Sequence, residues 1–143
     1  MGTVRDILNS KGNITFSITP DTTVYHALEI MFEKNVSSLV IMDKGRLAGI
    51  FTERDYCRKI ALKGRSSRET AVGEIMTERV ITVGPDSSID HCMQIMTDHF
   101  FRHIPVMEND KLMGIVSIGD VVKYIIQEQK FIIANMEQYI SRT

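Results

Sequence analysis

The sequence predicts an α+β fold of two tandem βαββα repeats related by a pseudo-two-fold axis, with an extended C-terminal helix. Shifting the chain by 65 positions, so that Pro20 falls on Pro85, aligns residues 20–56 with the second half without a gap. Gly49-Ile50 then falls on Gly114-Ile115. Each half also shows the same order of strand and helix patterns. Two copies are too few for a solenoid, so we expect a closed pair.

The first strand of each half is short and β-branched, at residues 15–18 and 80–83, and a Pro-Asp turn ends it. A helix follows, because apolar residues recur from Val24 and again from Ile89 at helical spacing. Thr23 and Ser88, or the aspartates two residues earlier, are the candidate N-caps.

Two strands and a second helix complete each repeat. The strands are expected at residues 38–42 and 47–52, and at 103–107 and 112–117, with polar hairpin turns between them. The second helix is expected over residues 53–62, and its counterpart begins near Ile118. One such sheet cannot cover both its faces, so the halves should pack together.

The chain divides into residues 1–70 (first repeat, N-terminal helix and linker), 71–129 (second repeat) and 130–143 (C-terminal helical extension). Residues 72–76 read as a short helix matching residues 4–8. Residues 121–140 hold helix formers and more apolar side chains than one half needs. The extension therefore either covers a partner subunit, as in a homodimer, or folds back on its own chain.

Composition narrows the class of protein. The chain of 143 residues has 43% hydrophobic and 24% charged residues and a net charge of −1, which predicts no nucleic-acid or membrane partner. No apolar run approaches the ~20 residues of a membrane span. Two cysteines, Cys57 and Cys92, suggest a reducing compartment, and a cytoplasmic location is the expectation. The histidines and cysteines lack metal-site spacing, so no metal is expected.

The candidate site follows the last strand of each half. Thr52 and Ser117 end these strands, and Asp55 and Asp120 stand three residues later at a helix start. A helix N-terminus and a hydroxyl favour a phosphate, and a carboxylate can accept two ribose hydroxyls. The alternative is structural, with the hydroxyl residues as caps and the aspartates in the first helical turn.

The pattern Gly-hydrophobic-x-Thr/Ser-x-x-Asp, with Ile104-Pro105-Val106 before its second copy, resembles the nucleotide motif of the CBS family. The resemblance covers residues 4–129 and implies a stand-alone CBS-domain pair (Bateman module). Residues 52–67 and 75–77 are similar to a subfamily of bacteria and plant organelles. Val40 departs from the pattern, since proline is usual there.

The resemblance implies a role for each matching residue. Asp55 and Asp120 would hold ribose hydroxyls, and Thr52 and Ser117 would contact phosphate. Arg102 and His103 would reach across to the Asp55 site, with Arg54 nearby, whereas their counterparts Ser37 and Ser38 carry no charge. Backbone and apolar side chains around residues 81–83, including Ile81 and Val83, and around residues 14–18 would sandwich the base. Ile104 and Pro105 would also belong to the nucleotide site.

Basic residues from Arg54 to Arg68 form either a solvated face or, for Arg65 and Arg68, a second phosphate site suited to NAD(H). The function we expect is regulatory: an AMP-, ADP- or ATP-binding module, without catalysis, that signals to a separate partner protein. The runner-up is an interaction and dimerisation scaffold with a vestigial cleft. A small nucleotide-hydrolysing enzyme is a distant third.

Overall fold

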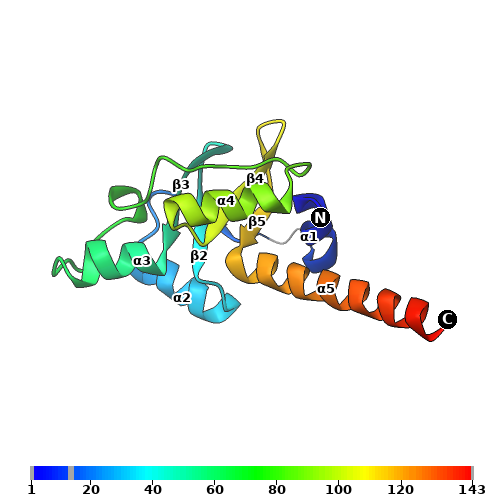
Figure 1. Ribbon diagram of the computed structural model, residues 1–143. Coiled ribbons are helices and arrows are strands. Elements are labelled where there is room, and N and C mark those ends of the chain that lie inside the picture. Colours follow the sequence, from blue (N-terminus) through cyan, green and yellow to red (C-terminus); the bar gives the residue numbers. More distant parts are fainter. Residues whose placement is uncertain (1, 13–14, 143) are drawn as a thin grey trace.

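The computed structural model describes residues 2–12 and 15–142 and contains both predicted repeats (Figure 1). In chain order the elements are α1 (Val4–Lys11), β1 (Ser17–Ile18), α2 (Val24–Lys34), β2 (Ser38–Asp43), β3 (Arg46–Thr52), α3 (Glu53–Asp55), the π-helix η1 (Tyr56–Ala61), the 3₁₀-helix η2 (Val72–Glu74), α4 (Ile89–His99), β4 (His103–Glu108), β5 (Lys111–Ser117) and α5 (Ile118–Ser141).

The first repeat has a three-stranded sheet in the order β1-β2-β3, with β1 parallel to β2 and β3 antiparallel to it. The second has only the β4-β5 pair. The strand predicted at residues 80–83 is therefore wrong, because it is reduced to one parallel bridge between Val83 and Val106. This bridge is the repeat equivalent of the Ile18–Ile41 pair, since both residues are 65 positions later.

Pro105 explains the missing strand. Val83 donates its N–H to the Pro105 carbonyl and accepts a bond from Met107 N–H. The next rung of this ladder would need an N–H from Pro105, which proline lacks. Its counterpart in the first repeat is Val40, which pairs with Ser17 in β1.

The helices begin where the caps predict. The Thr23 side chain accepts a hydrogen bond from His26 N–H, and the Ser88 side chain accepts one from His91 N–H. These two residues, and not the preceding aspartates, are therefore the N-caps. The helix predicted over residues 53–62 is one α-helical turn followed by the π-helix η1.

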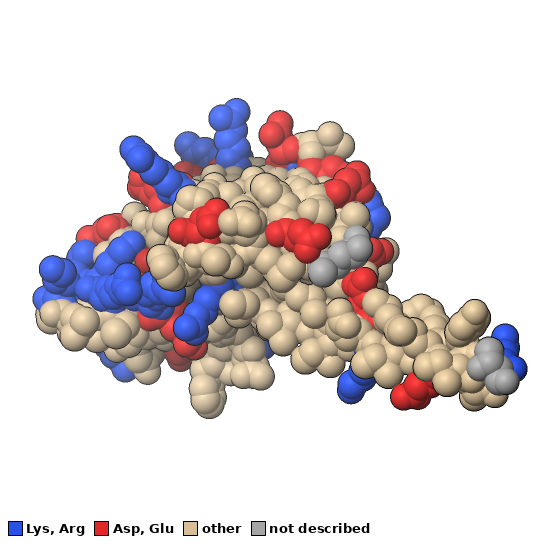
Figure 2. Space-filling model, viewed as in Figure 1, with Lys and Arg blue, Asp and Glu red and all other residues tan. Residues whose placement is uncertain are grey.

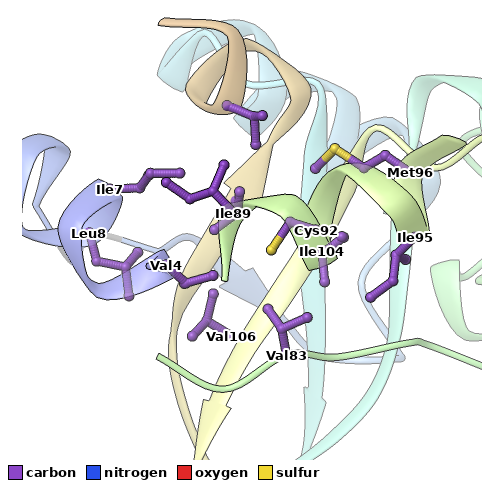
Figure 3. Close-up of a cluster of buried hydrophobic side chains, with 12 residues drawn as sticks. Val4, Ile7, Leu8, Val83, Ile89, Cys92, Ile95, Met96, Ile104 and Val106 are labelled. Carbon is purple, nitrogen blue, oxygen red and sulfur yellow. The ribbon is translucent and has the colours of Figure 1, made fainter. Parts of the chain in front are cut away.

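The two repeats exchange segments. Val4, Ile7 and Leu8 of α1 lie in the core of the second repeat, with Val83, Ile89 and Val106 among others (Figure 3). Val72 of η2 and Ile75, the residue after η2, lie in the core of the first repeat. The N-terminal helix thus belongs to residues 1–70 along the chain, but its packing partner is the other half.

Matching hydrogen bonds fix both exchanged segments. Val4 N–H donates to the Ser87 carbonyl at 2.9 Å, and Val72 N–H donates to the Thr22 carbonyl at 2.8 Å. The donors are 68 positions apart, as in the predicted match of residues 4–8 with residues 72–76. The acceptors are 65 positions apart, as in the main repeat, so the two bonds are equivalent. The predicted match between residues 4–8 and 72–76 is confirmed at the level of packing.

Helix α5 follows β5 directly and has 24 residues, and its C-terminal part extends away from the rest of the molecule (Figure 1). Its first turns contact α1, α4 and β5, and Val121 is buried. All the residues described from position 129 onward are exposed. They include Phe131, Ile133, Met136 and Ile140, so the extension does not fold back on its own chain.

Candidate functional site

The larger candidate site is a cavity of about 310 Å³ beside Asp55, built by both repeats. This volume lies at the lower end of the range of small-molecule sites. Segments around β3, α3 and the residues before β2 supply one wall, and residues 77–81 and 101–103 supply the other. Its lining residues are Ser37, Ile50, Thr52, Glu53, Arg54, Asp55, Arg58, Lys59, Thr77, Arg79, Val80, Ile81, Phe101, Arg102 and His103.

Both motif aspartates form capping boxes. Thr52 Oγ1 accepts the Asp55 N–H at 3.2 Å while Asp55 Oδ2 accepts the Thr52 N–H at 3.0 Å. Ser117 and Asp120 form the same pair of bonds at 3.1 and 2.8 Å. The structural alternative is thus real in both repeats: these pairs satisfy backbone N–H groups that each helix start leaves free.

The second oxygen of Asp55 is also engaged. Asp55 Oδ1 accepts a hydrogen bond from Thr77 Oγ1 at 3.1 Å and lies 3.0 Å from Lys59 Nζ. The side chain is only 8% exposed, so the carboxylate lies at the floor of the cavity with all its partners in place. Both oxygens of this carboxylate therefore have partners from the chain itself.

Cations dominate the Asp55 cavity. Arg54, Arg58, Lys59, Arg79 and Arg102 line it, against the acids Glu53 and Asp55. Arg54 donates to the Phe100 carbonyl at 2.8 Å and so ties the first repeat to the second. Figure 2 shows Lys and Arg gathered at the end of the molecule where α3 lies, while the projecting part of α5 carries few charges. The cavity is therefore locally positive although the whole chain has a net charge of −1.

His103 begins β4 and reaches the first repeat. Its Nε2 lies 2.9 Å from Ser37 Oγ, a hydrogen bond between the two halves. Burial lowers the pKa of His103 below its usual value; the Asp120 charge opposes this shift and the charges of Lys11, Arg102 and Arg54 add to it. The imidazole is therefore neutral at neutral pH.

The second cavity, of about 300 Å³, lies beside Asp120 and is nearly free of net charge. Lys11 Nζ lies 2.6 Å from Asp120 Oδ2, so the exchanged helix α1 places its own cation there. Asp120 Oδ1 has no hydrogen-bond partner within the described part of the chain. The cavity is lined by Lys11, Thr15, Phe16, Asn35, Val36, Ser37, Ser38, Val40, His103, Ile115, Ser117 and Asp120.

Most predicted site residues meet as expected. Thr52, Arg54, Asp55, Ile81, Arg102 and His103 line the first cavity, and Ser117 and Asp120 line the second. The prediction that the two sites differ in charge is also met. Val83 and Ile104 pack in the core of the second repeat, and Pro105 is buried in β4, so none of these three predicted residues is among the lining residues of either cavity.

The second phosphate site predicted at Arg65 and Arg68 is not formed in the structure. Arg65 Nη2 pairs with Glu74 Oε1 at 2.9 Å, and Arg68 lies 3.9 Å from the ring centre of Tyr25. Neither lines the Asp55 cavity. Ile14, predicted to contact the base, lies outside the described residues.

Among the lining residues that sequence reasoning missed, three share one reason. Thr77 and Arg79 enter the first cavity and Lys11 enters the second because the segments before them are exchanged between repeats. The available signal was the similarity of residues 4–8 and 72–76, which predicts equivalent packing for the residues that follow.

Among residues 2–12 and 15–142, no group of three or more His, Cys, Asp and Glu side chains is arranged to hold a metal ion. Within the same ranges, every helix is too short or too polar to cross a membrane.

Comparison with known proteins gives one consistent result. The family model described as "CBS domain" matches residues 4–62 and 72–127. The CBS domain-containing protein CBSX3, mitochondrial, of Arabidopsis thaliana is 44% identical over 147 residues, which cover 96% of this chain and 71% of the relative.

Solved structures give the same match in three dimensions. A putative signal-transduction protein with CBS domains from Burkholderia ambifaria superposes with a TM-score of 0.86 at 46% identity, covering 89% of this chain and 96% of that one. The CBS domain pair of protein MJ0100, in complex with 5-methylthioadenosine and S-adenosyl-L-methionine, superposes with a TM-score of 0.79 at 26% identity, covering 90% and 98%.

Proposed function

The chain belongs to the CBS domain family as a pair of CBS repeats in a small protein, and from this premise we propose that it is a regulatory module that binds an adenine nucleotide beside Asp55. The observation that carries the proposal is the cation-rich cavity of about 310 Å³ built from both repeats. The adenosine-containing ligands of the MJ0100 domain pair support an adenosyl group as the bound moiety.

In the proposed complex the ribose hydroxyls bind Asp55 Oδ1. They replace Lys59, whose side chain is 41% exposed and can turn toward the phosphates. The phosphates lie near Arg54 from the first repeat and Arg102 from the second. Ile81 and Val80 contact the base. The capping box on Oδ2 stays intact, so one carboxylate serves both the helix start and the ligand.

The charge of the cavity favours AMP, ADP or ATP over an unphosphorylated nucleoside, because charge-assisted bonds to phosphate are the strongest available there. NAD(H) ranks below them. A second phosphate would have to draw Arg65 from Glu74 or Arg68 from Tyr25. The Asp120 cavity, where Lys11 already neutralises the acid, suits a ligand with little net charge.

Binding between the repeats lets a ligand favour one relative arrangement of the halves, and a shifted arrangement alters the surface offered to a partner. The proposed role is therefore signalling to a separate protein, without catalysis, by a homodimer formed through the exposed face of α5. Cys57 and Cys92 are both unpaired, which supports a reducing compartment such as the cytoplasm. The alternative function is a dimerisation scaffold that uses α5 alone.

The test is isothermal titration of the full chain with AMP, ATP, NADH, S-adenosylmethionine and adenosine. We expect AMP or ATP to bind, with affinity reduced about tenfold to a hundredfold in Asp55→Asn, since a hydrogen bond to a charged group is worth about 1.5–3 kcal/mol. Arg102→Gln should weaken both nucleotides and leave adenosine unchanged.

Arg46→Gln is the matched control for charge. Arg46 starts β3 at the exposed hairpin and lies outside both cavities. Equal losses in Arg46→Gln and Arg102→Gln would show that only the overall charge matters, and not the cavity. An absence of binding by all five ligands at millimolar concentration would reject the sensor and leave the scaffold.

A further inference from the structure

One pair of side chains separates the two cavities. Ser37 and His103 line both of them, and their hydrogen bond of 2.9 Å joins the residue before β2 to the first residue of β4. The repeat places Ser38 opposite His103, so only one side of the pseudo-two-fold carries an imidazole. A change in the protonation or hydrogen bonding of this pair therefore alters the lining of both cavities.

Protonation changes what the pair offers to a ligand. In the imidazolium both ring nitrogens donate, so Nε2–H must donate to Ser37 Oγ. The Ser37 hydroxyl hydrogen is then available to an acceptor in either cavity. In the neutral ring, Nε2 can accept from Ser37 instead, and this hydrogen is used up.

Charged groups face His103 from every neighbouring element. Arg54 on α3 and Arg102 beside it lie on the side of the Asp55 cavity, whereas Asp120 on α5 and Lys11 on α1 lie on the other. In the free protein the cations and burial disfavour the imidazolium, and Asp120 favours it. A phosphate beside Arg54 and Arg102 offsets their charge and so favours the imidazolium.

We propose that His103 is a specificity-determining residue shared by both sites, which couples the ligand of the Asp55 cavity to protons and to the occupant of the Asp120 cavity. The inference rests on the proposed function for its ligand. A phosphorylated ligand takes up a proton as it binds, and so binds more tightly as pH falls toward the pKa of His103 in the complex. A ligand of the Asp120 cavity that draws Asp120 away from His103 lowers the affinity of the Asp55 cavity for the phosphorylated ligand. By linkage, the phosphorylated ligand lowers the affinity for that second ligand by the same factor.

The sign follows from proton binding. With its pKa lowered in the free protein, His103 is neutral when folded and begins to protonate near pH 6.5 when unfolded. The free protein therefore loses stability as pH falls below about 6.5. Bound phosphate raises the folded pKa and reduces this loss.

The experiment is a pH titration of the His103 imidazole by NMR, in the free full-length chain, with AMP, and in Asp120→Asn. We expect AMP to raise the midpoint by about half to one pH unit, and Asp120→Asn to lower it, because the neighbouring anion is removed. Calorimetry should show AMP bound about twofold to fourfold more tightly at pH 6 than at pH 7.5, beyond the change in His103→Gln. That variant subtracts the titration of the phosphate itself.

His91→Gln is the control, since His91 is exposed on α4 and lines neither cavity. A His103 midpoint that moves with neither AMP nor Asp120→Asn overturns the coupling, as does the same pH dependence of affinity in wild type and His103→Gln. Failure of AMP to bind at any pH rejects the proposed function instead. The Asp120→Asn midpoint then still decides whether His103 responds to the second cavity.

Discussion

At the scale of single residues, two glycines permit the exchange of segments. A Cβ on Gly49 would lie 2.7 Å from the Thr77 carbonyl oxygen, and one on Gly114 would lie 2.8 Å from Leu8 Cδ2. Gly49 and Gly114 are equivalent under the repeat, and each lies against the exchanged segment that completes its own half. Both glycines belong to the motif that predicts the nucleotide site, but their packing role concerns stability.

Alanine at these glycines should destabilise the protein unequally. We expect Gly49→Ala to cost about 2–3 kcal/mol and Gly114→Ala about 1 kcal/mol, because overpacking costs 1–3 kcal/mol and a leucine methyl moves more easily than a paired backbone. The Thr77 carbonyl accepts the Ile50 N–H at 3.0 Å, so moving it breaks a bond. Urea unfolding measures both free energies.

Gly84→Ala serves as the control for these variants. A Cβ there would lie no closer than 3.9 Å to another residue, at the Met107 carbonyl. Its stability should stay within about 0.5 kcal/mol of wild type. Equal costs in Gly49→Ala and Gly114→Ala would show that the backbone at Thr77 yields as readily as a side chain.

At the scale of elements, periodicity predicted most of the fold. The apolar stripes predicted helices that begin at Val24 and Ile89, as the structure shows, and the four hairpin strands formed. The strand predicted at residues 80–83 did not form, because Pro105 in the neighbouring strand has no N–H to donate to it. The strand propensity of residues 80–83 carries no information about that neighbour. Patterns within a segment predict its type, whereas its partner decides whether the ladder forms.

The candidate site divides in the same way. Thr52, Asp55, Ser117 and Asp120 were predictable because motif and element coincide. Lys59 and Thr77 were not assigned to Asp55, since their contacts depend on the π-helix η1 and on the exchanged linker. Site residues that are positioned by tertiary packing are difficult to predict from the local sequence.

The extension at the end of helix α5 is the expected dimer interface. Deleting residues 130–143 removes exposed apolar side chains, including Phe131, Ile133 and Met136. We expect the truncated chain to keep its fold and its nucleotide affinity while its dimer weakens or is lost. Sedimentation velocity and the AMP titration report the two properties separately.

The charge change Lys130→Gln is the control for this deletion, since it alters the same helix without removing apolar surface. A truncated chain that still sediments as a dimer would place the dimer interface elsewhere. A monomeric full-length chain would contradict the homodimer itself.

At the scale of the whole molecule, the exchanged segments predict one cooperative unfolding transition. Ile7 and Ile75 are equivalent residues that complete opposite cores, and both are nearly fully buried. Ile7→Ala and Ile75→Ala should each cost about 2–5 kcal/mol. Each should shift the entire transition, so that circular dichroism and tyrosine fluorescence give coincident curves.

Leu62→Ala is the control, because Leu62 is 76% exposed and completes neither core. Two separate transitions, with Ile7→Ala lowering only one of them, would show that the halves unfold independently despite the exchange.

The exchange also sets an order on the ribosome. Helix α1 emerges first, but the strands that bury Val4 and Leu8 are translated about a hundred residues later. During synthesis the first repeat acquires its complete core only when Ile75 has left the exit tunnel. At elongation rates of about 5–20 residues per second, the apolar face of the nascent N-terminal helix therefore stays uncovered for several seconds.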